Sequence, residues 1–263
     1  LESFLESRAT HPVKRWVSKA AWGNAGRGLL LLNKERILTD PERGWLKRQI
    51  SWGLLIEPWI HRRADLSFQG VIDEEGIRYE GAVVGFVDHL GRFHGAELSP
   101  PQAALEVSLK RFLNGDGRDR GRLKRVGTLV VKTIGKLLAQ QGFYGAFGVD
   151  ALIGHLEEDE STPLVIYPVV EVNPRYTMGH LTLALRRSID PQGRQAAHVK
   201  FYPPKTPNEW FAQKLNERPL SWGDQGQWRS GIIPLNDLWR ECRLSKTNDS
   251  TLAYGSGPVV LLE

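Results

Sequence analysis

The sequence predicts an α+β fold with antiparallel sheets. Residues 66–72 and 81–88 alternate apolar and polar side chains, which is typical of strands with one buried face. Residues 100–112 and 123–141 instead repeat apolar side chains at helical spacing. Because strands and helices occur in separate runs along the chain, the pattern favours antiparallel sheets.

The first quarter of the chain predicts three short strands and one helix. Strands are expected over residues 13–19 and 29–32, joined by a glycine-containing turn. A helix with a basic face is expected over residues 41–50. The apolar run 53–60 is expected to be a strand that enters a linker, and residues 88–91 are expected to form a later hairpin turn.

The middle of the chain predicts two long strands between helices. Gly142 is expected at the C′ position that ends the helix over 123–141. Strands are expected over residues 147–153 and 164–172, joined by a short acidic segment, and a helix over 177–187. The last 70 or so residues mix short strands with a helix over 207–217.

Composition limits the class of protein. The chain has 263 residues, of which 41% are hydrophobic, enough to bury a sizeable core. Its net charge of +5 is spread along the chain, so we expect neither nucleic acid nor a membrane as partner. Cys242 is the single cysteine, which excludes an internal disulfide and favours a reducing, cytoplasmic location. No apolar run approaches the roughly 20 residues of a membrane span.

The start of the chain also carries an expectation. The first residue is Leu1, and the single methionine is Met178. We therefore expect an N-terminal domain of the same protein to precede this chain.

A polar cluster is predicted where two neighbouring strands carry oxygen-bearing side chains. Asp150 lies on one predicted strand, and Glu171 and Asn173 lie on the next, two residues apart and so on one face. Two carboxylates and an amide form the hard oxygen ligand set that Mg²⁺ prefers. Arg175 would place a fixed positive charge beside that metal. The alternative is a structural strand pair with one polar face.

A second candidate site is the run KAAWGNAGRG from Lys19 to Gly28. Glycines such as Gly23 and Gly26 let the backbone approach a phosphate closely, and Lys19 adds a point charge. The run lacks the Gly-Lys-Ser/Thr ending of a Walker A loop, and its glycine spacing differs from the Rossmann pattern. The alternative interpretation is an ordinary glycine hairpin.

A third candidate is the run LLIEPWI over residues 54–60. A strand that enters a linker can offer backbone groups to the edge of an adenine ring. Pro58 has no N–H, so it can only accept, through its carbonyl, whereas the Ile60 N–H can donate. Asp65, just beyond, could bind ribose hydroxyls.

These three motifs, in this order, resemble the ATP-grasp superfamily of ATP-dependent carboxylate-amine ligases. The resemblance covers residues 13–187 and implies two α+β lobes with antiparallel sheets that grip ATP between them. It implies a small lobe over 1–58 with a glycine lid loop, a large lobe over 59–190 with the metal site, and an extension over 191–263 packed on the large lobe.

The resemblance also implies residue roles. Residues implied to bind ATP are Lys19, Gly23, Gly26, Arg27, Glu57, Pro58, Ile60 and Asp65. Asp150, Glu171 and Asn173 would bind Mg²⁺, which Mn²⁺ could replace, and Arg175 and Lys19 would act in catalysis. Many members carry a basic residue two positions before the first metal aspartate, whereas this chain has Gly148.

The implied reaction is ATP-dependent activation of a carboxylate as an acyl-phosphate, followed by attack of an amine or another nucleophile. The implied partners are a small carboxylate and its acceptor, and a homodimer is a further expectation. Two alternatives stay open: a kinase that stops at phosphorylation, and a nucleotide-binding module without catalysis.

Overall fold

The computed structural model describes residues 13–21, 28–34, 36–87, 93–101, 105–114, 121–156, 162–189, 198–202, 208–222, 228–234 and 259–262. By its internal contacts the chain divides into two compact units. The first comprises residues 1–64, 88–92 and 152–167, and the second comprises 65–87, 93–151 and 168–263.

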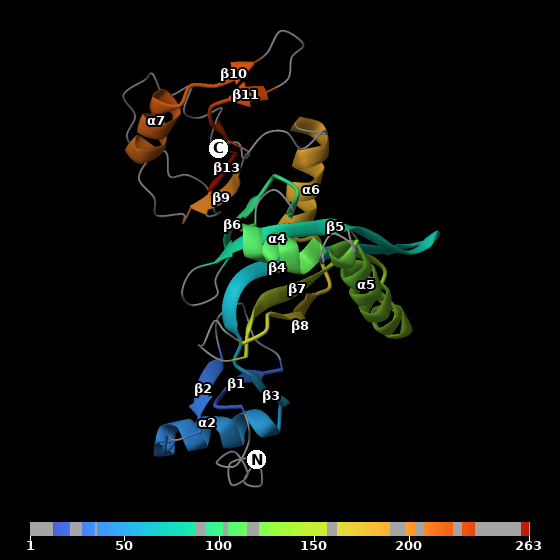
Figure 1. Ribbon diagram of the computed structural model, residues 1–263, viewed down its shortest axis with the longest axis vertical. Coiled ribbons are helices and arrows are strands. Elements are labelled where there is room, and N and C mark those ends of the chain that lie inside the picture. Colours follow the sequence, from blue (N-terminus) through green and yellow to red (C-terminus); the bar gives the residue numbers. More distant parts are fainter. Residues whose placement is uncertain are drawn as a thin grey trace. The chain divides into compact units, whose positions relative to one another are not determined.

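The first unit contains a three-stranded antiparallel sheet in the order β2-β1-β3 with one helix on it (Figure 1). Its elements are β1 (Arg15–Ala20), β2 (Leu29–Asn33), α2 (Asp40–Ile50) and β3 (Leu54–Pro58). The buried core between sheet and helix consists of Trp16, Leu32, Leu38 and Leu46. The strands and the helix predicted for this part of the sequence are confirmed.

Helix α2 begins at a capping box. The Thr39 side chain accepts a hydrogen bond from the Glu42 N–H, and the Glu42 carboxylate accepts one from the Thr39 N–H at 2.9 Å. The two residues thereby satisfy two backbone donors that a helix start leaves free. This local chemistry fixes where the helix starts, and Leu46 is thereby directed onto the sheet.

The larger sheet has eight strands in the order β12-β13-β9-β6-β5-β4-β7-β8. Its strands are β4 (His61–Asp73), β5 (Gly76–Val87), β6 (Phe93–Glu97), β7 (Gly145–His155), β8 (Val165–Asn173), β9 (His198–Tyr202), β12 (Ile233–Pro234) and β13 (Val259–Leu262). Every pair whose register is resolved is antiparallel, which confirms the predicted sheet type.

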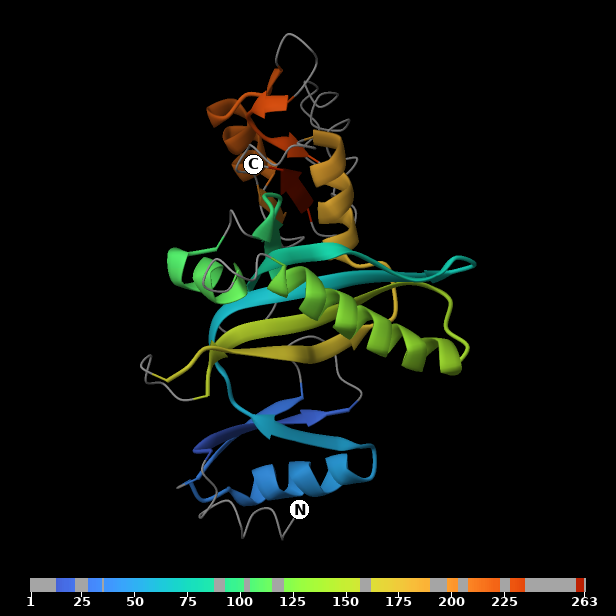
Figure 2. The same ribbon diagram turned by 45° about the vertical axis from the view of Figure 1, so that its right-hand side comes forward.

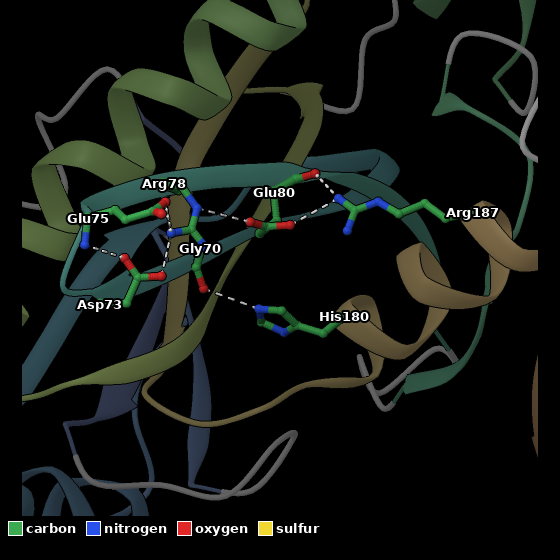
Figure 3. A network of polar contacts seen from close by, with 7 residues as sticks. All are labelled: Gly70, Asp73, Glu75, Arg78, Glu80, His180 and Arg187. Atoms are coloured by element: carbon green, nitrogen blue, oxygen red, sulfur yellow. Dashed lines mark hydrogen bonds and ion pairs between the residues drawn. The ribbon is translucent and has the colours of Figure 1, made fainter.

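Strands β4 and β5 form a long hairpin whose tip carries paired charges (Figure 3). Arg78 pairs with Asp73 and with Glu75 at 3.1 Å. Further along β5, Glu80 pairs with Arg187 at 3.0 Å. Strand β5 begins before its predicted range, because the polar residues near the tip hide the alternation there. Strand β4 begins before its predicted range at the other end of the hairpin, in the largely polar run HRRAD over residues 61–65.

Helix α5 (Arg122–Gln140) packs on β5 and runs across the strands of the sheet (Figure 2). Two glycines on its buried side make this approach close, since a Cβ at Gly127 would lie 2.8 Å from the Tyr79 ring. The helix ends as predicted: Gly142 has φ +78° and its N–H bonds to the Ala139 carbonyl at 2.9 Å.

Helix α6 (Met178–Ile189) covers the other face of the sheet. A Cβ at Gly70 of β4 would meet Val131 of α5, whereas a Cβ at Gly179 of α6 would meet the neighbouring side chain, Gln69. Because neighbouring strand residues point to opposite faces, α5 and α6 lie on opposite faces of β4. The two helices thus cover the part of the sheet that carries the polar cluster described below.

The remaining elements are short. They are α4 (Val107–Asn114), α7 (Asn208–Glu217), β10 (Ser221–Trp222) and β11 (Trp228–Ser230). The prediction of one continuous helix over 100–112 is wrong, because Leu105 and Glu106 are not helical and α4 begins at Val107. None of the helices in the described ranges has the length and apolar character needed to span a lipid bilayer.

Candidate functional site

Lys19 and Glu57 lie side by side on the small sheet of the first unit. Lys19 lies opposite Leu55 in the register of β1 and β3, and Glu57 is two residues further along β3. The Lys19 ammonium and the Glu57 carboxylate form an ion pair, and each side chain is 18% exposed. The structure therefore brings together two of the residues predicted to bind ATP.

The face of the small sheet that carries this ion pair is apolar. Trp16 faces α2, so the alternation along β1 directs Lys19 to the opposite face. On that face Leu29, Leu31 and Leu55 are 45%, 50% and 52% exposed. Sequence analysis missed this surface, because four consecutive leucines in β2 show no alternation.

Tyr167 of β8 completes the cluster. Its hydroxyl donates a hydrogen bond to Glu57, and burial together with that carboxylate raises the pKa of Tyr167 to about 12. Glu57 is therefore held between a cation and a phenol. Sequence analysis missed Tyr167, since a single tyrosine in an apolar strand is the only signal.

The predicted glycine loop is described only at its base. Gly23, Gly26 and Arg27 lie outside the described residues. At the base, the Ala20 N–H bonds to the Gly28 carbonyl at 3.1 Å, and Gly28 has φ +72°. The antiparallel pairing of β1 and β2 thus brings the two ends of the loop together beside Lys19.

Three other predicted ATP-binding residues lie along the chain from β3 into β4. Pro58 ends β3, and Ile60, which is buried, lies between the two strands. Asp65 lies on β4 opposite Gly85 of β5 and belongs to the second unit. Their roles with the nucleotide stay predictions.

The structure brings two of the three predicted metal ligands, Asp150 and Asn173, together in the second unit. Asp150 lies on β7, and Asn173 is the last residue of the neighbouring strand β8. The Asn173 amide donates to an Asp150 carboxylate oxygen at 3.0 Å, and Arg175 donates to the Asn173 oxygen at 2.9 Å. Glu171 lies two residues before Asn173 and therefore on the same face of β8.

Opposing effects act on the charge of Asp150. Burial raises the pKa of Asp150, while hydrogen bonds from Ser67 and Asn173 and the positive charge of Arg175 lower it. A cation bound at this carboxylate would favour the ionised form further.

The donor set fits Mg²⁺. Within the described ranges no three His, Cys, Asp or Glu side chains lie close enough together to hold a metal ion. A cation here would therefore need a mixed set, the carboxylates of Asp150 and Glu171 with the amide oxygen of Asn173. An amide oxygen has two lone pairs, so Asn173 can accept from Arg175 and still bind a cation.

A chain of partly buried polar side chains leads away from Asp150. Ser67 of β4 donates to Asp150 at 2.7 Å, and Gln69 donates to the Ser67 hydroxyl at 2.7 Å. Thr177, just before α6, donates to the Gln69 oxygen at 2.6 Å. Sequence analysis missed these residues; alternation along β4 puts Ser67 and Gln69 on one face, and that was the available signal.

His180 anchors the start of α6 to the sheet (Figure 3). Its Nδ1 accepts the Thr177 N–H at 3.2 Å, so its Nε2 carries the hydrogen and donates to the Gly70 carbonyl at 3.2 Å. Burial lowers the pKa of His180. His180 is only 7% exposed, so this first turn of α6 faces the sheet and not solvent.

No protein-family model matches the chain. Over 177 residues it is 25% identical to butirosin acyl-carrier protein–L-glutamate ligase of Niallia circulans, a match that covers 67% of this chain and 36% of that protein. The chain thus spans little more than a third of the length of this curated relative.

One solved structure with a TM-score above 0.5 gives the fold. The biotin carboxylase domain of Hydrogenobacter thermophilus 2-oxoglutarate carboxylase, in complex with MgADP, ADP and bicarbonate, aligns with 99% of this chain and 55% of its own, with a TM-score of 0.54 at 16% identity. The chain has the ATP-grasp fold. An ADP complex of Staphylococcus aureus N5-carboxyaminoimidazole synthetase aligns with 89% of this chain and 61% of its own, with a TM-score of 0.45 at 14% identity.

The ATP-grasp fold confirms the resemblance predicted from the three sequence motifs. It also confirms the predicted α+β class with antiparallel sheets. The roles of individual residues in this ATP-grasp chain are the subject of the proposal below.

Proposed function

We propose that this chain is the catalytic part of an ATP- and Mg²⁺-dependent ligase. In this proposal it activates a carboxylate as an acyl-phosphate, which an amine or another nucleophile then attacks. The observation that carries the proposal is the cluster of Asp150, Asn173 and Arg175, where a carboxylate on β7 meets an amide at the end of β8 and the guanidinium that follows it. The curated relative, itself named a ligase, supports the same class of reaction.

The first unit would bind the nucleotide. Lys19 offers a positive charge for the phosphates, while Glu57 and the Pro58 carbonyl can accept hydrogen bonds from the adenine amino group. The exposed leucines beside Lys19 offer an apolar surface that suits a purine ring. The lid loop that contains Gly23, Gly26 and Arg27 would close over the phosphates and exclude water.

The second unit would supply the chemistry. Asp150, Glu171 and Asn173 would hold Mg²⁺, which neutralises charge on the phosphates of ATP. Arg175, already oriented by its hydrogen bond to Asn173, would stabilise negative charge on the transferred phosphoryl group. In this scheme the chain's residues position and neutralise the reactants, and no side chain forms a covalent bond with them.

The reaction balances in two steps. A carboxylate oxygen attacks the γ-phosphorus of ATP, the bond to the β,γ-bridging oxygen breaks, and ADP leaves. The nucleophile then attacks the acyl carbon, phosphate leaves, and an amide forms when the nucleophile is an amine.

We further propose residues 1–58 as the small lobe, 59–190 as the large lobe and 191–263 as an extension on it.

The name of the curated relative guides the choice of substrate. That enzyme is named for the ligation of L-glutamate to a carrier protein. We therefore propose an amino acid as the activated carboxylate, with L-glutamate as the first candidate to test.

Trapping of the acyl-phosphate tests this proposal. Incubation with MgATP, a panel of amino acids and hydroxylamine should yield an amino-acid hydroxamate and ADP in equal amounts. Asp150→Asn should abolish both products, while Arg187→Ala, on the exposed end of α6, serves as the control that retains them. A stable phosphorylated product would indicate a kinase, and ATP binding without ADP release under all conditions would indicate a non-catalytic module; either result contradicts the proposal.

A further inference from the structure

Gln69 occupies a slot between β7 and the start of α6. Its side chain is 0% exposed although it is polar. A Cβ on Gly148 of β7 would lie 2.7 Å from a Thr177 methyl carbon and 3.2 Å from the Gln69 oxygen, and a Cβ on Gly179 of α6 would overlap the Gln69 amide. Glycine at both positions therefore leaves the space that Gln69 and Thr177 fill.

This slot explains a departure noted in the sequence. Gly148 stands two residues before Asp150, where many ATP-grasp proteins carry a basic residue. Any side chain at this position would collide with Thr177. The chain has replaced a charge beside Asp150 with a neutral hydrogen-bonded connection.

The hydrogens along this connection all point toward Asp150. Ser67 donates its single hydrogen to Asp150, so it must accept from the Gln69 amide nitrogen. The orientation of the Gln69 amide is thereby fixed, and its oxygen accepts from Thr177. From the other side, Arg175 donates to Asn173, and Asn173 donates to the second Asp150 oxygen.

The backbone between β8 and α6 links the two ends of this hydrogen-bonded connection. Asn173, Arg175 and Thr177 lie on the segment that joins β8 to α6, and each is tied directly or indirectly to Asp150. A shift of Thr177 would therefore move Arg175 and Asp150 relative to each other. A buried polar network of this kind holds a single geometry only when each member has its partner.

We infer that Gln69 and Thr177 are positioning residues, which hold Arg175 and the metal-binding carboxylate of Asp150 in one fixed arrangement through Ser67. This inference rests on the proposed function. Removal of a group that hydrogen-bonds to a metal ligand, without touching the metal, typically lowers metal affinity or activity about 10- to 100-fold.

A matched pair of variants at Thr177 tests the inference. Thr177→Val keeps the shape but loses the hydroxyl, while Thr177→Ser keeps the hydroxyl. Thermal unfolding with ATP is followed while Mg²⁺ is added, and the result is the Mg²⁺ concentration that gives half of the maximal rise in Tm. The constants kcat and KM for ATP are measured as well. We expect Thr177→Val to raise that concentration and lower kcat about tenfold or more, with KM for ATP changed less than threefold. We expect Thr177→Ser to resemble the wild type.

A double-mutant cycle with Ser67→Ala provides the second test. If Thr177 acts through Gln69 and Ser67, the double variant should show little more loss of Mg²⁺ affinity and kcat than either single variant. If the two residues acted independently, their losses would add. Unfolding without nucleotide is measured for each variant, and Ser67→Ala with Gln69→Leu replaces the pair if Thr177→Val does not fold. Additive losses, or a Thr177→Val variant equal to wild type, would overturn the inference. Absence of Mg²⁺-dependent ATP binding in the wild type would instead overturn the proposed function.

Discussion

At the scale of single residues, the charge of Glu57 shapes its surroundings. The carboxylate pairs with Lys19 and accepts a hydrogen bond from Tyr167. Burial alone raises the pKa of a phenol, as it does for Tyr79, whose pKa is raised to about 12 although Arg186 acts in the opposite direction. Tyr167 reaches the same value with the help of Glu57. The two tyrosines therefore form an internal comparison.

Glu57→Gln should lower the pKa of Tyr167 toward its ordinary value of about 10 and leave that of Tyr79 unchanged. The raised pKa means that Tyr167 stabilises the fold below about pH 10, and that this contribution is lost as the pH rises through about 12. Ultraviolet titration of tyrosinate measures Tyr167 in a Tyr79→Phe background and Tyr79 in a Tyr167→Phe background. A Tyr167 pKa that stays at about 12 in Glu57→Gln would contradict this account.

His180 carries a pH dependence of the opposite sign. Its Nδ1 must stay unprotonated to accept the Thr177 N–H, and burial lowers its pKa, against smaller opposing effects of the Gly70 carbonyl and of Glu80. As the pH falls below about 6.5 the unfolded chain takes up this proton first, so stability is lost.

The free energy of unfolding of the wild type should therefore fall more steeply between about pH 7 and 5 than that of His180→Gln. Urea unfolding at a series of pH values measures it. Equal slopes for wild type and His180→Gln would show that His180 does not titrate differently on folding.

At the scale of elements, the start of α2 depends on its capping box. Thr39→Ala removes the acceptor for the Glu42 N–H and should lower the free energy of unfolding by about 1 kcal/mol, within a range of about 0.5–2 kcal/mol. Thr39→Ser retains the hydroxyl and should unfold like the wild type or slightly later, because serine caps a helix at least as well as threonine. Urea unfolding compares the variants, and equal values for Ala and Ser would exclude a capping role.

The close contact between α5 and β5 depends on glycine. Alanine favours a helix by about 1 kcal/mol over glycine. Gly127→Ala should nevertheless destabilise the protein, because the new methyl group would overlap the Tyr79 ring and overpacking costs about 1–3 kcal/mol. Thr133→Ala, exposed on the same helix, should be neutral or stabilising. A Gly127→Ala variant more stable than wild type by urea unfolding would contradict the packing described for this helix.

The sequence predicted most elements because their periodicity is strong. Helix α5, with its Gly142 ending, and the strands that carry Asp150 and Glu171 follow from local patterns alone. The break at Leu105 and Glu106, just before α4, was missed because the apolar spacing does not reveal it. The hydrogen bond from Thr177 to Gln69 could not be predicted, because it joins residues 108 positions apart through packing at Gly148 and Gly179.

At the scale of the whole molecule, the two units offer complementary chemistry. The first presents Lys19 and Glu57 on an apolar face, and the second presents carboxylate, amide and guanidinium groups around Asp150. Motif order along the sequence was sufficient to predict both groups. It did not reveal Tyr167, Ser67 or Gln69, since they carry no motif and are defined only by what they contact.

The dependence of ATP binding on Mg²⁺ tests the central claim most directly. Thermal unfolding of wild type and Glu171→Ala is measured with ATP alone and with ATP plus Mg²⁺, since a ligand that binds the folded state raises its stability. We predict that ATP stabilises both proteins and that Mg²⁺ adds a further increase in the wild type, which Glu171→Ala loses. An equal Mg²⁺-dependent increase in both proteins would contradict the account, as would a wild type on which Mg²⁺ has no effect.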